Sequence, residues 1–228
     1  MWQDLYRELG PRGLRIVTVA LDTGGVEAVR SAIEAAQPEH PTLIDRAHVV
    51  DELFGITNVP SGVWIDEAGR IVRPPETAYP RRPNYQDREI PPDASAEEVA
   101  EIAEVKKLRT EAETYVAALR DWVELGAESR FVLAPEEVLR RSQPRGVGEA
   151  RAAAHFELGQ HLHLLGRAED AVPHFREAYR LQPDNWTYKR QAWELLTPHQ
   201  TPVEVYGSDW LTDVRKIGAE NYYPPLEM

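Results

Sequence analysis

Hydrophobic positions in the first third of the chain alternate between the spacing of helices and the spacing of strands. Apolar residues at positions 2, 5, 6 and 9 share one face of a helix, which the Gly-Pro pair at 10–11 ends. The run 15–21 is rich in β-branched residues and predicts a buried strand. A second amphipathic helix over 26–36 and a short extended segment over 40–45 follow. Helices and strands that alternate in this way predict an α/β sheet.

The next stretch, residues 47–73, predicts a short helix and then a β-hairpin. The helix covers 47–54 and ends at Gly55. Two apolar runs, at 62–65 and 70–73, flank a turn that contains Gly69. An antiparallel pair of strands is therefore expected to close the sheet.

The pattern changes at residue 74. Residues 74–93 are polar and rich in proline, which indicates a linker. Ser95 and Glu98 then have the spacing of a capping box, and an apolar stripe continues to about residue 125, so a single long helix is predicted. The pattern divides the chain into an α/β domain over 1–73, a linker over 74–93 and a helical domain over 94–228.

Composition and charge restrict the classes of partner. The 228 residues are 42% hydrophobic and 28% charged, which is typical of a globular protein. The net charge of −12 opposes binding to nucleic acid or to an anionic membrane, because both require clustered Lys and Arg. No apolar run approaches the roughly 20 residues that span a bilayer, and the first residues lack the features of a secretory signal. As written, the sequence predicts a cytoplasmic protein, and a start further upstream would leave its location open.

The chain contains no cysteine. Disulfides and thiolate metal sites therefore cannot form within it. Dithiol exchange is excluded as well, because that reaction requires a thiolate that attacks a disulfide sulfur.

The most specific pattern lies in residues 51–72. It comprises a helix that ends in Phe54-Gly55, the pair Val59-Pro60, an apolar strand that ends in Ile65-Asp66, and the strand Gly69-Arg70-Ile71-Val72. This order resembles the second half of thioredoxin-like domains of the TlpA, ResA and redoxin type, and residues 1–73 follow the family order throughout. A generic hairpin would not explain a proline directly before a core strand, where a backbone donor is lost. The resemblance implies a cis peptide bond between Val59 and Pro60.

The chain also departs from this family. In the family a strand precedes the first helix, and a Cys-x-x-Cys motif lies at the amino end of that helix, where the dipole stabilises a thiolate. Residues 2–9 resemble the later turns of that helix, so the cysteines would lie before Met1. Either the sequence belongs to a longer protein, or the lineage has lost the motif and the first strand. A sheet without that strand has a gap or open edge, so a homodimer or strand exchange is a further expectation.

Residues 151–183 resemble one tetratricopeptide repeat. Small residues at Gly159, Ala171 and Ala178 would let two antiparallel helices approach closely. Larger side chains are expected to fill the space between these helices, namely Leu158, Leu162 and Phe175. A single repeat needs neighbours to bury its faces, and the candidates are the helices predicted at 95–125, at 135–141 and from residue 184.

The candidate site is the pair Val59 and Pro60. The resemblance implies that the backbone of the residue before the proline pairs with an extended peptide. The alternative is that Pro60 only shapes the loop. No catalytic residue, cofactor site or metal site is predicted, and a protein or peptide is the expected partner.

Other polar and aromatic groups have structural explanations. His161 and His163 are two residues apart on a helix and point about opposite ways, so they cannot chelate a metal together. The acidic pairs at 97–98, 136–137 and 169–170 lie in the first turns of predicted helices, where they offset the dipole. Core packing is expected for the tryptophans at 64, 122, 186, 193 and 210. The aromatic tail over 206–225 is expected to dock on the protein itself or on a partner.

These observations together predict a cysteine-free binding module of thioredoxin-like ancestry. The first alternative is the C-terminal part of an active thiol-disulfide oxidoreductase whose dithiol lies upstream. The second is a glutathione transferase-like enzyme, which also joins a thioredoxin-like domain to helices. The second is weaker, because residues 71–75, Ile-Val-Arg-Pro-Pro, stand where that family has the Glu/Gln-Ser pair that holds glutathione.

Overall fold

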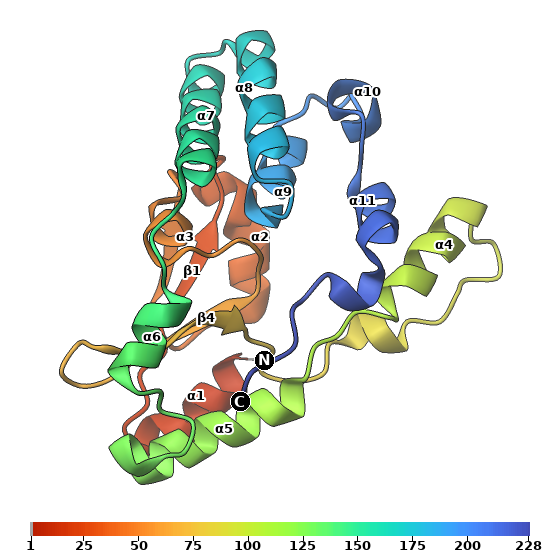
Figure 1. Cartoon of the computed structure of the whole chain (residues 1–228). Coiled ribbons are helices and arrows are strands. Elements are labelled where there is room, and N and C mark those ends of the chain that lie inside the picture. The colour runs from red at the N-terminus through yellow and green to blue at the C-terminus, as the bar shows by residue number, and fades with distance from the viewer. Residues whose placement is uncertain (1) are drawn as a thin grey trace.

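The strands of this mixed α/β protein form two separate pairs. The computed structural model describes residues 2–228 (Figure 1). Strands β1 (Thr18–Leu21) and β2 (Thr42–Asp45) are parallel, and β3 (Ser61–Ile65) and β4 (Ile71–Thr77) are antiparallel. The predicted hairpin is confirmed, and the predicted single sheet is replaced by two two-stranded sheets.

Helices make up most of the remaining chain, in three groups. Helices α1, α2 and α3 alternate with the strands, α7 and α8 stand upright as a pair, and α10 and α11 belong to the C-terminal part of the chain (Figure 1). Their bounds are α1 (Trp2–Leu9), α2 (Val26–Ala36), α3 (Val49–Phe54), α4 (Ala96–Val105), α5 (Ala112–Leu125), α6 (Pro135–Arg141), α7 (Val147–Leu164), α8 (Ala168–Leu181), α9 (Trp186–Glu194), α10 (Pro202–Tyr206) and α11 (Trp210–Ile217).

Strand β1 is shorter and less buried than its sequence predicts. The predicted strand covered 15–21, whereas the structure pairs only residues 18–21 with β2. All four residues of β1 are half-buried, and Val17 before it is 56% exposed. A β-branched run of this kind is usually buried between covered faces. The exposure arises because β1 has a neighbour on one side alone, which leaves its other edge open.

The predicted helix over 95–125 is wrong as a single element. The capping box at its start is confirmed, since the Glu98 amide donates to Ser95 Oγ at 3.2 Å and the Glu98 carboxylate accepts from the Ser95 amide at 2.9 Å. The helix then ends after Val105, and a new one starts at Ala112 after Glu111, whose φ is +42°. The break allows α4 to pack on α11 while α5 packs on the hairpin.

The predicted linker begins later than residue 74. Strand β4 continues through Thr77, and the next two residues, Ala78 and Tyr79, are buried. Pro74 and Pro75 fit within β4 because it is an edge strand, where a missing backbone donor leaves no partner unpaired.

One hydrophobic cluster joins α5 to the first part of the chain. Leu5 and Leu9 of α1 pack with Trp64 of β3 and with Tyr115 and Leu119 of α5. Helices α1 and α5 lie side by side below the hairpin (Figure 1). The core of the α/β part thus includes a helix from beyond the predicted linker.

Helices α7 and α8 form the closely packed antiparallel pair that the sequence predicts. A Cβ atom at Gly159 would lie 2.7 Å from a ring carbon of Phe175, so glycine is required there. Ala171 and Ala178 are fully buried as expected. Leu158 was expected between the helices, but it is 41% exposed, and Phe156 fills that space instead.

The neighbours of this pair differ in part from the expected ones. Helix α9 packs on α8 as predicted, whereas α6 packs on β4. His48, which precedes α3, contacts the Phe156 ring edge-on at 5.0 Å. The pair therefore rests on the α/β part of the chain. Across residues 2–228, no helix combines the length and the apolar character needed to cross a membrane.

Candidate functional site

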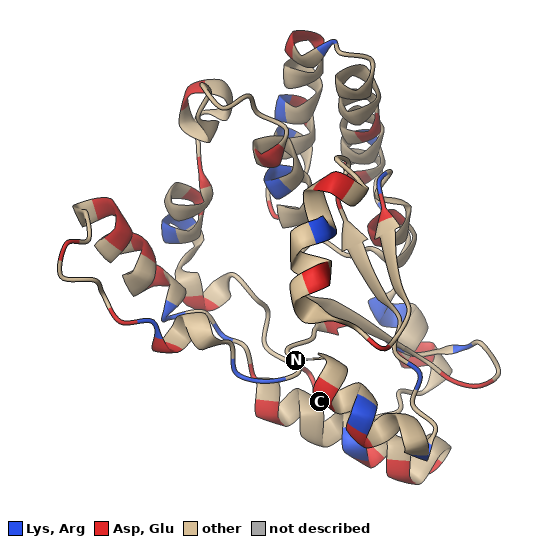
Figure 2. Cartoon of the chain, turned by 180° about the vertical axis from the view of Figure 1, so that it is seen from behind, with Lys and Arg blue, Asp and Glu red and all other residues tan. Residues whose placement is uncertain are grey.

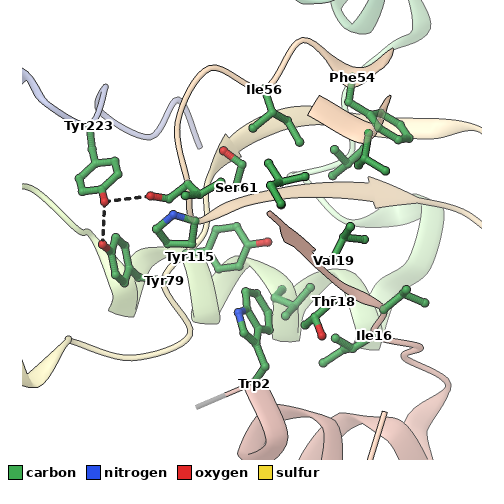
Figure 3. Close-up of a pocket in the computed structure, with 18 of the residues that line it drawn as sticks. Trp2, Ile16, Thr18, Val19, Phe54, Ile56, Ser61, Tyr79, Tyr115 and Tyr223 are labelled. Carbon is green, nitrogen blue, oxygen red and sulfur yellow. Dashed lines mark hydrogen bonds between the residues drawn. The ribbon is translucent and has the colours of Figure 1, made fainter. Parts of the chain in front are cut away.

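An apolar groove separates the two sheets. Its volume is about 980 Å³, and it is lined by residues 16–19 and 21 from β1 and its approach and by residues 59–65 from β3 and its approach. Figure 3 shows Thr18 and Val19 on one side of this space and Ser61 on the other. Within the described chain, β1 pairs only with β2 and β3 only with β4, so the two facing edges keep unpaired backbone groups.

Aromatic side chains from the helices cover one face of the groove. Trp2 of α1 and Tyr115 of α5 line it, with their rings edge to face at 6.2 Å (Figure 3). Trp64 Nε1 donates a hydrogen bond to the Tyr115 hydroxyl at 3.0 Å, and Trp64 stacks on Trp122 at 4.9 Å. Trp64, Trp122 and Trp210 all line the groove. These three tryptophans therefore form part of the groove wall in addition to the core packing that the sequence predicts.

Helix α9 closes one end of the groove. The amide of Trp186, its first residue, donates to the Thr57 carbonyl at 2.6 Å, shortly before β3 begins. Gln191, further along α9, accepts from the Thr23 amide at 2.7 Å, directly after β1 ends. The carboxyl end of β1 and the amino end of β3 therefore meet at α9, which means that the two facing edges run in opposite directions.

Val59 and Pro60, the site predicted from the sequence, lie at this end of the groove. Both line it, and the peptide bond between them is cis. The backbone of Val59 already has internal partners. Its amide donates to Asn58 Oδ1 at 2.9 Å, and its carbonyl accepts from the Tyr223 hydroxyl at 3.0 Å. A peptide that approaches Val59 meets a carbonyl shared with Tyr223 and an amide that is already bonded.

The C-terminal tail supplies this contact, so it docks on the protein itself. Tyr222 and Tyr223 are buried, and the Tyr222 carbonyl accepts from Asn58 Nδ2 at 3.0 Å. The Tyr79 hydroxyl donates to that of Tyr223 at 3.0 Å (Figure 3). The Tyr85 hydroxyl in turn donates to that of Tyr79 at 2.7 Å. Burial raises the pKa of the Tyr79, Tyr85 and Tyr223 hydroxyls, so each one stays neutral and acts as a hydrogen-bond donor.

A buried polar network lies behind the groove, between the α/β part and the helix pair. His48 Nδ1 is 2.9 Å from Asp51 Oδ2, and His48 Nε2 is 3.0 Å from Gln191 Oε1. Gln160 of α7 donates to Thr23 Oγ1 at 2.6 Å. His48 and Thr23 are almost fully buried, so a substrate cannot reach them. The network therefore holds the α/β part of the chain against α7 and α9.

Glu52 stands at the edge of this network. Its carboxylate contacts the Tyr188 hydroxyl and the Arg145 guanidinium. Burial, together with the nearby negative charge of Asp51, raises the pKa of Glu52 to about 7. This carboxyl therefore changes charge near neutral pH.

The remaining candidates lie outside the groove. His161 is exposed and His163 half-buried, while His155 and His174 stack across α7 and α8 with their Nδ1 atoms 3.0 Å apart. No cluster of three or more His, Asp or Glu suited to a metal occurs in residues 2–228. Glu98 caps α4, and Glu137 binds Arg140 and Arg141, which lower its pKa to about 2. All three acidic pairs lie in the first turns of their helices, as predicted, and Glu98 in addition makes a capping hydrogen bond.

Comparison of the chain with protein-family models, curated proteins and solved structures finds no match. The arrangement of the groove is therefore the basis for assigning a function.

Sequence reasoning missed several residues of this site. Tyr79, Tyr85 and Arg190 were assigned no role, although all three line the groove. The aromatic tail was the one available signal, because side chains of this kind usually pack on other aromatic residues when they are buried. Nothing local indicates which segment those partners come from, because Tyr79 and Tyr223 are 144 residues apart.

Proposed function

We propose that this chain is a peptide-binding protein of the thioredoxin-like class, and that an extended peptide adds as a strand between β1 and β3. One observation carries the proposal: two strand edges with unpaired backbone groups face each other across an apolar groove. Unpaired edges are templates for another strand, and strand addition is a common mode of peptide recognition.

The chemistry of the groove favours an extended backbone over a compact ligand. A strand placed there would find N–H and C=O groups on both sides, and its side chains would alternate between the two faces. One of those faces is aromatic, with Trp2 and Tyr115. The half-buried residues of β1 would then gain the burial that their sequence predicts.

The order of elements supports the thioredoxin-like class. A helix, a parallel pair linked by α2, a third helix and a hairpin follow one another in the order that the resemblance implies. In that family the first strand fills the position that corresponds to the gap between β1 and β3. A groove in this position is therefore suited to an added strand.

The test uses an acetylated and amidated octapeptide of alternating valine and threonine. Hydrogen exchange should slow in residues 16–21 and 61–65 when the peptide is added, and the fluorescence of Trp2 and Trp64 should change in a saturable way. Light scattering of the free chain establishes whether a second copy already fills the groove. Unchanged exchange in both segments of a monomeric chain would refute the proposal.

A pair of variants makes this test specific. Val19 lines the groove, and its register partner Leu43 on β2 is outside it and 55% exposed. Val19→Arg should abolish peptide binding because it places a charge in the groove, whereas Leu43→Arg should retain it. Circular dichroism of both variants checks that each one folds.

A second candidate function follows from the same gap. A strand of a longer form of this protein could fill the groove and bring a Cys-x-x-Cys motif close to Val59 and Pro60, as in a thiol-disulfide oxidoreductase. The upstream reading frame tests this candidate, because it must encode a strand and two cysteines. The chain itself should show no insulin reduction, since it has no thiolate.

A further inference from the structure

The groove differs in charge from the protein as a whole. The charged residues that line the groove are Arg15, Arg88, Arg190 and Glu101, although the whole chain has a net charge of −12. Glu101 is exposed on α4, a helix with acidic residues along its length (Figure 2). Arg190 is half-buried on α9, the helix that closes the groove.

Arg190 has aromatic partners where a buried guanidinium usually has an anion. Its Nη2 atom donates to the Tyr222 hydroxyl, and its guanidinium lies 5.6 Å from the centre of the Tyr222 ring. No carboxylate in residues 2–228 forms a salt bridge with it, whereas the neighbouring Lys189 is paired with Asp213 at 2.7 Å. A partly buried positive charge without an anion is costly, so the site is complementary to a negative ligand.

The phenols around Arg190 do not supply that negative charge. Burial is the main cause that raises the pKa of Tyr222 to about 12, and it also raises the pKa of Tyr223. Both hydroxyls are therefore neutral at physiological pH. They orient the guanidinium by hydrogen bonding and leave its charge uncompensated.

Of the two orientations that a peptide strand can take between β1 and β3, one brings its carboxyl end to Arg190. The carboxyl end of β1 lies at α9, because Thr23 bonds to Gln191, the residue next to Arg190. A peptide strand parallel to β1 therefore has its own carboxyl end at α9. In that orientation the terminal carboxylate is the group closest to the guanidinium.

We propose that Arg190 binds the C-terminal carboxylate of the peptide, so that the groove selects the C-terminal strand of a partner protein. This inference rests on the proposed strand-binding function. The planar guanidinium matches a carboxylate with two parallel hydrogen bonds, and Trp210 and Tyr85 line the groove beside it. Arg88, an exposed residue that also lines the groove, adds positive charge to it.

The test compares two acetylated octapeptides of alternating valine and threonine, one with a free C-terminal carboxylate and one with an amide. Titration calorimetry with the unaltered chain should give an affinity at least about tenfold higher for the carboxylate, the factor that corresponds to ~1.4 kcal/mol. This comparison needs no variant and so does not depend on the folding of one.

Variants then assign the effect to Arg190. In Arg190→Gln the preference for the carboxylate should disappear, so the two peptides should bind this variant with equal affinity. Arg190→Lys should retain part of the preference, because the charge remains and the two-pronged geometry is lost. The matched control is Arg215→Gln, which removes an exposed arginine of α11 outside the groove and should keep the full preference.

The outcomes separate this inference from the proposed function. Equal binding of both peptides would overturn the role of Arg190 and leave the strand-binding function standing. No binding of either peptide, without slowed exchange in β1 and β3, would overturn both. An amidated peptide with glutamate as its last residue that binds as tightly as the free carboxylate would overturn selection of a C-terminus and indicate an acidic side chain instead.

Discussion

The hydroxyl of Tyr223 donates a hydrogen bond to the carbonyl of Val59 at 3.0 Å, and this contact joins residues 164 positions apart. It fixes the C-terminal tail to the loop that leads into β3. The carbonyl belongs to the residue that the sequence marked as the peptide site. The end of the groove is thus built jointly by the first and last parts of the chain.

Removal of this hydroxyl should weaken the fold modestly. Tyr223→Phe deletes the bond to Val59 and leaves the buried hydroxyl of Tyr79 without its acceptor, which should cost about 1–3 kcal/mol of unfolding free energy. Urea unfolding followed by circular dichroism measures the change. Tyr206→Phe is the control, because no residue in 2–228 hydrogen-bonds to the Tyr206 hydroxyl, and its stability should be almost unaffected. Equal losses in both variants would contradict the structural role of the Tyr223 contact.

Glu52 should make stability depend on pH near neutrality. Its pKa is about 7 in the folded protein, above its ordinary value of 4.5, so the folded state holds a proton that the unfolded state releases. The stabilising contribution is complete below about pH 4.5 and is lost as the pH rises through 7. The free energy of unfolding should therefore fall between pH 5 and pH 8, by at most about 1.4 kcal/mol per pH unit for this single proton.

The variant Glu52→Gln tests this assignment by urea unfolding at several pH values. It should have a shallower slope between pH 5 and pH 8 than the unaltered chain. Some slope should remain, because His48 also has a raised pKa. Burial alone would lower the pKa of His48, and the hydrogen bond and charge of Asp51 raise it. An unchanged slope in Glu52→Gln would exclude Glu52 as a source of the pH dependence.

Two glycines of α7 should respond in opposite directions to the same substitution. A Cβ atom at Gly159 would meet the buried Phe175 ring, so Gly159→Ala should destabilise the protein by about 1–3 kcal/mol. Gly148 has no neighbouring atom within 4 Å of such a Cβ, and Gly148→Ala should stabilise by up to about 1 kcal/mol, because alanine favours a helix. Thermal unfolding of both variants gives the comparison. A neutral Gly159→Ala would mean that α7 and α8 pack less closely than the structure indicates.

The predicted α/β domain should not fold without the helical region. Residues 1–93 lack α5, so Leu5, Leu9 and Trp64 would lose the Tyr115 and Leu119 side chains that cover them. This fragment should show no cooperative unfolding transition in urea, whereas the full chain should. A cooperative transition in the fragment would support the domain boundary predicted from the sequence and would mean that α5 is dispensable.

The hairpin and the helix caps could be predicted because their determinants are neighbours in the sequence. Ile65 lies opposite Ile71 across a turn that contains Gly69, with φ +76°. Ser95 and Glu98 cap α4 through side chains three residues apart. The closely packed pair of helices α7 and α8 could also be predicted, since Gly159 and two alanines recur at fixed offsets.

By itself, the sequence determined most of the local elements, the mixed α/β class and the lack of a thiol in this chain, because spacing, capping and composition act over a few residues or over the whole chain. Only the tertiary structure decided that the helix over 95–125 breaks, that the tail docks at Val59 and that β1 and β3 leave a groove between them. Each of these depends on burial against residues far away in the chain. The contact of Tyr223 with Tyr79 and the place of Arg190 at the end of the groove have no local signature, since they arise from the way distant segments pack.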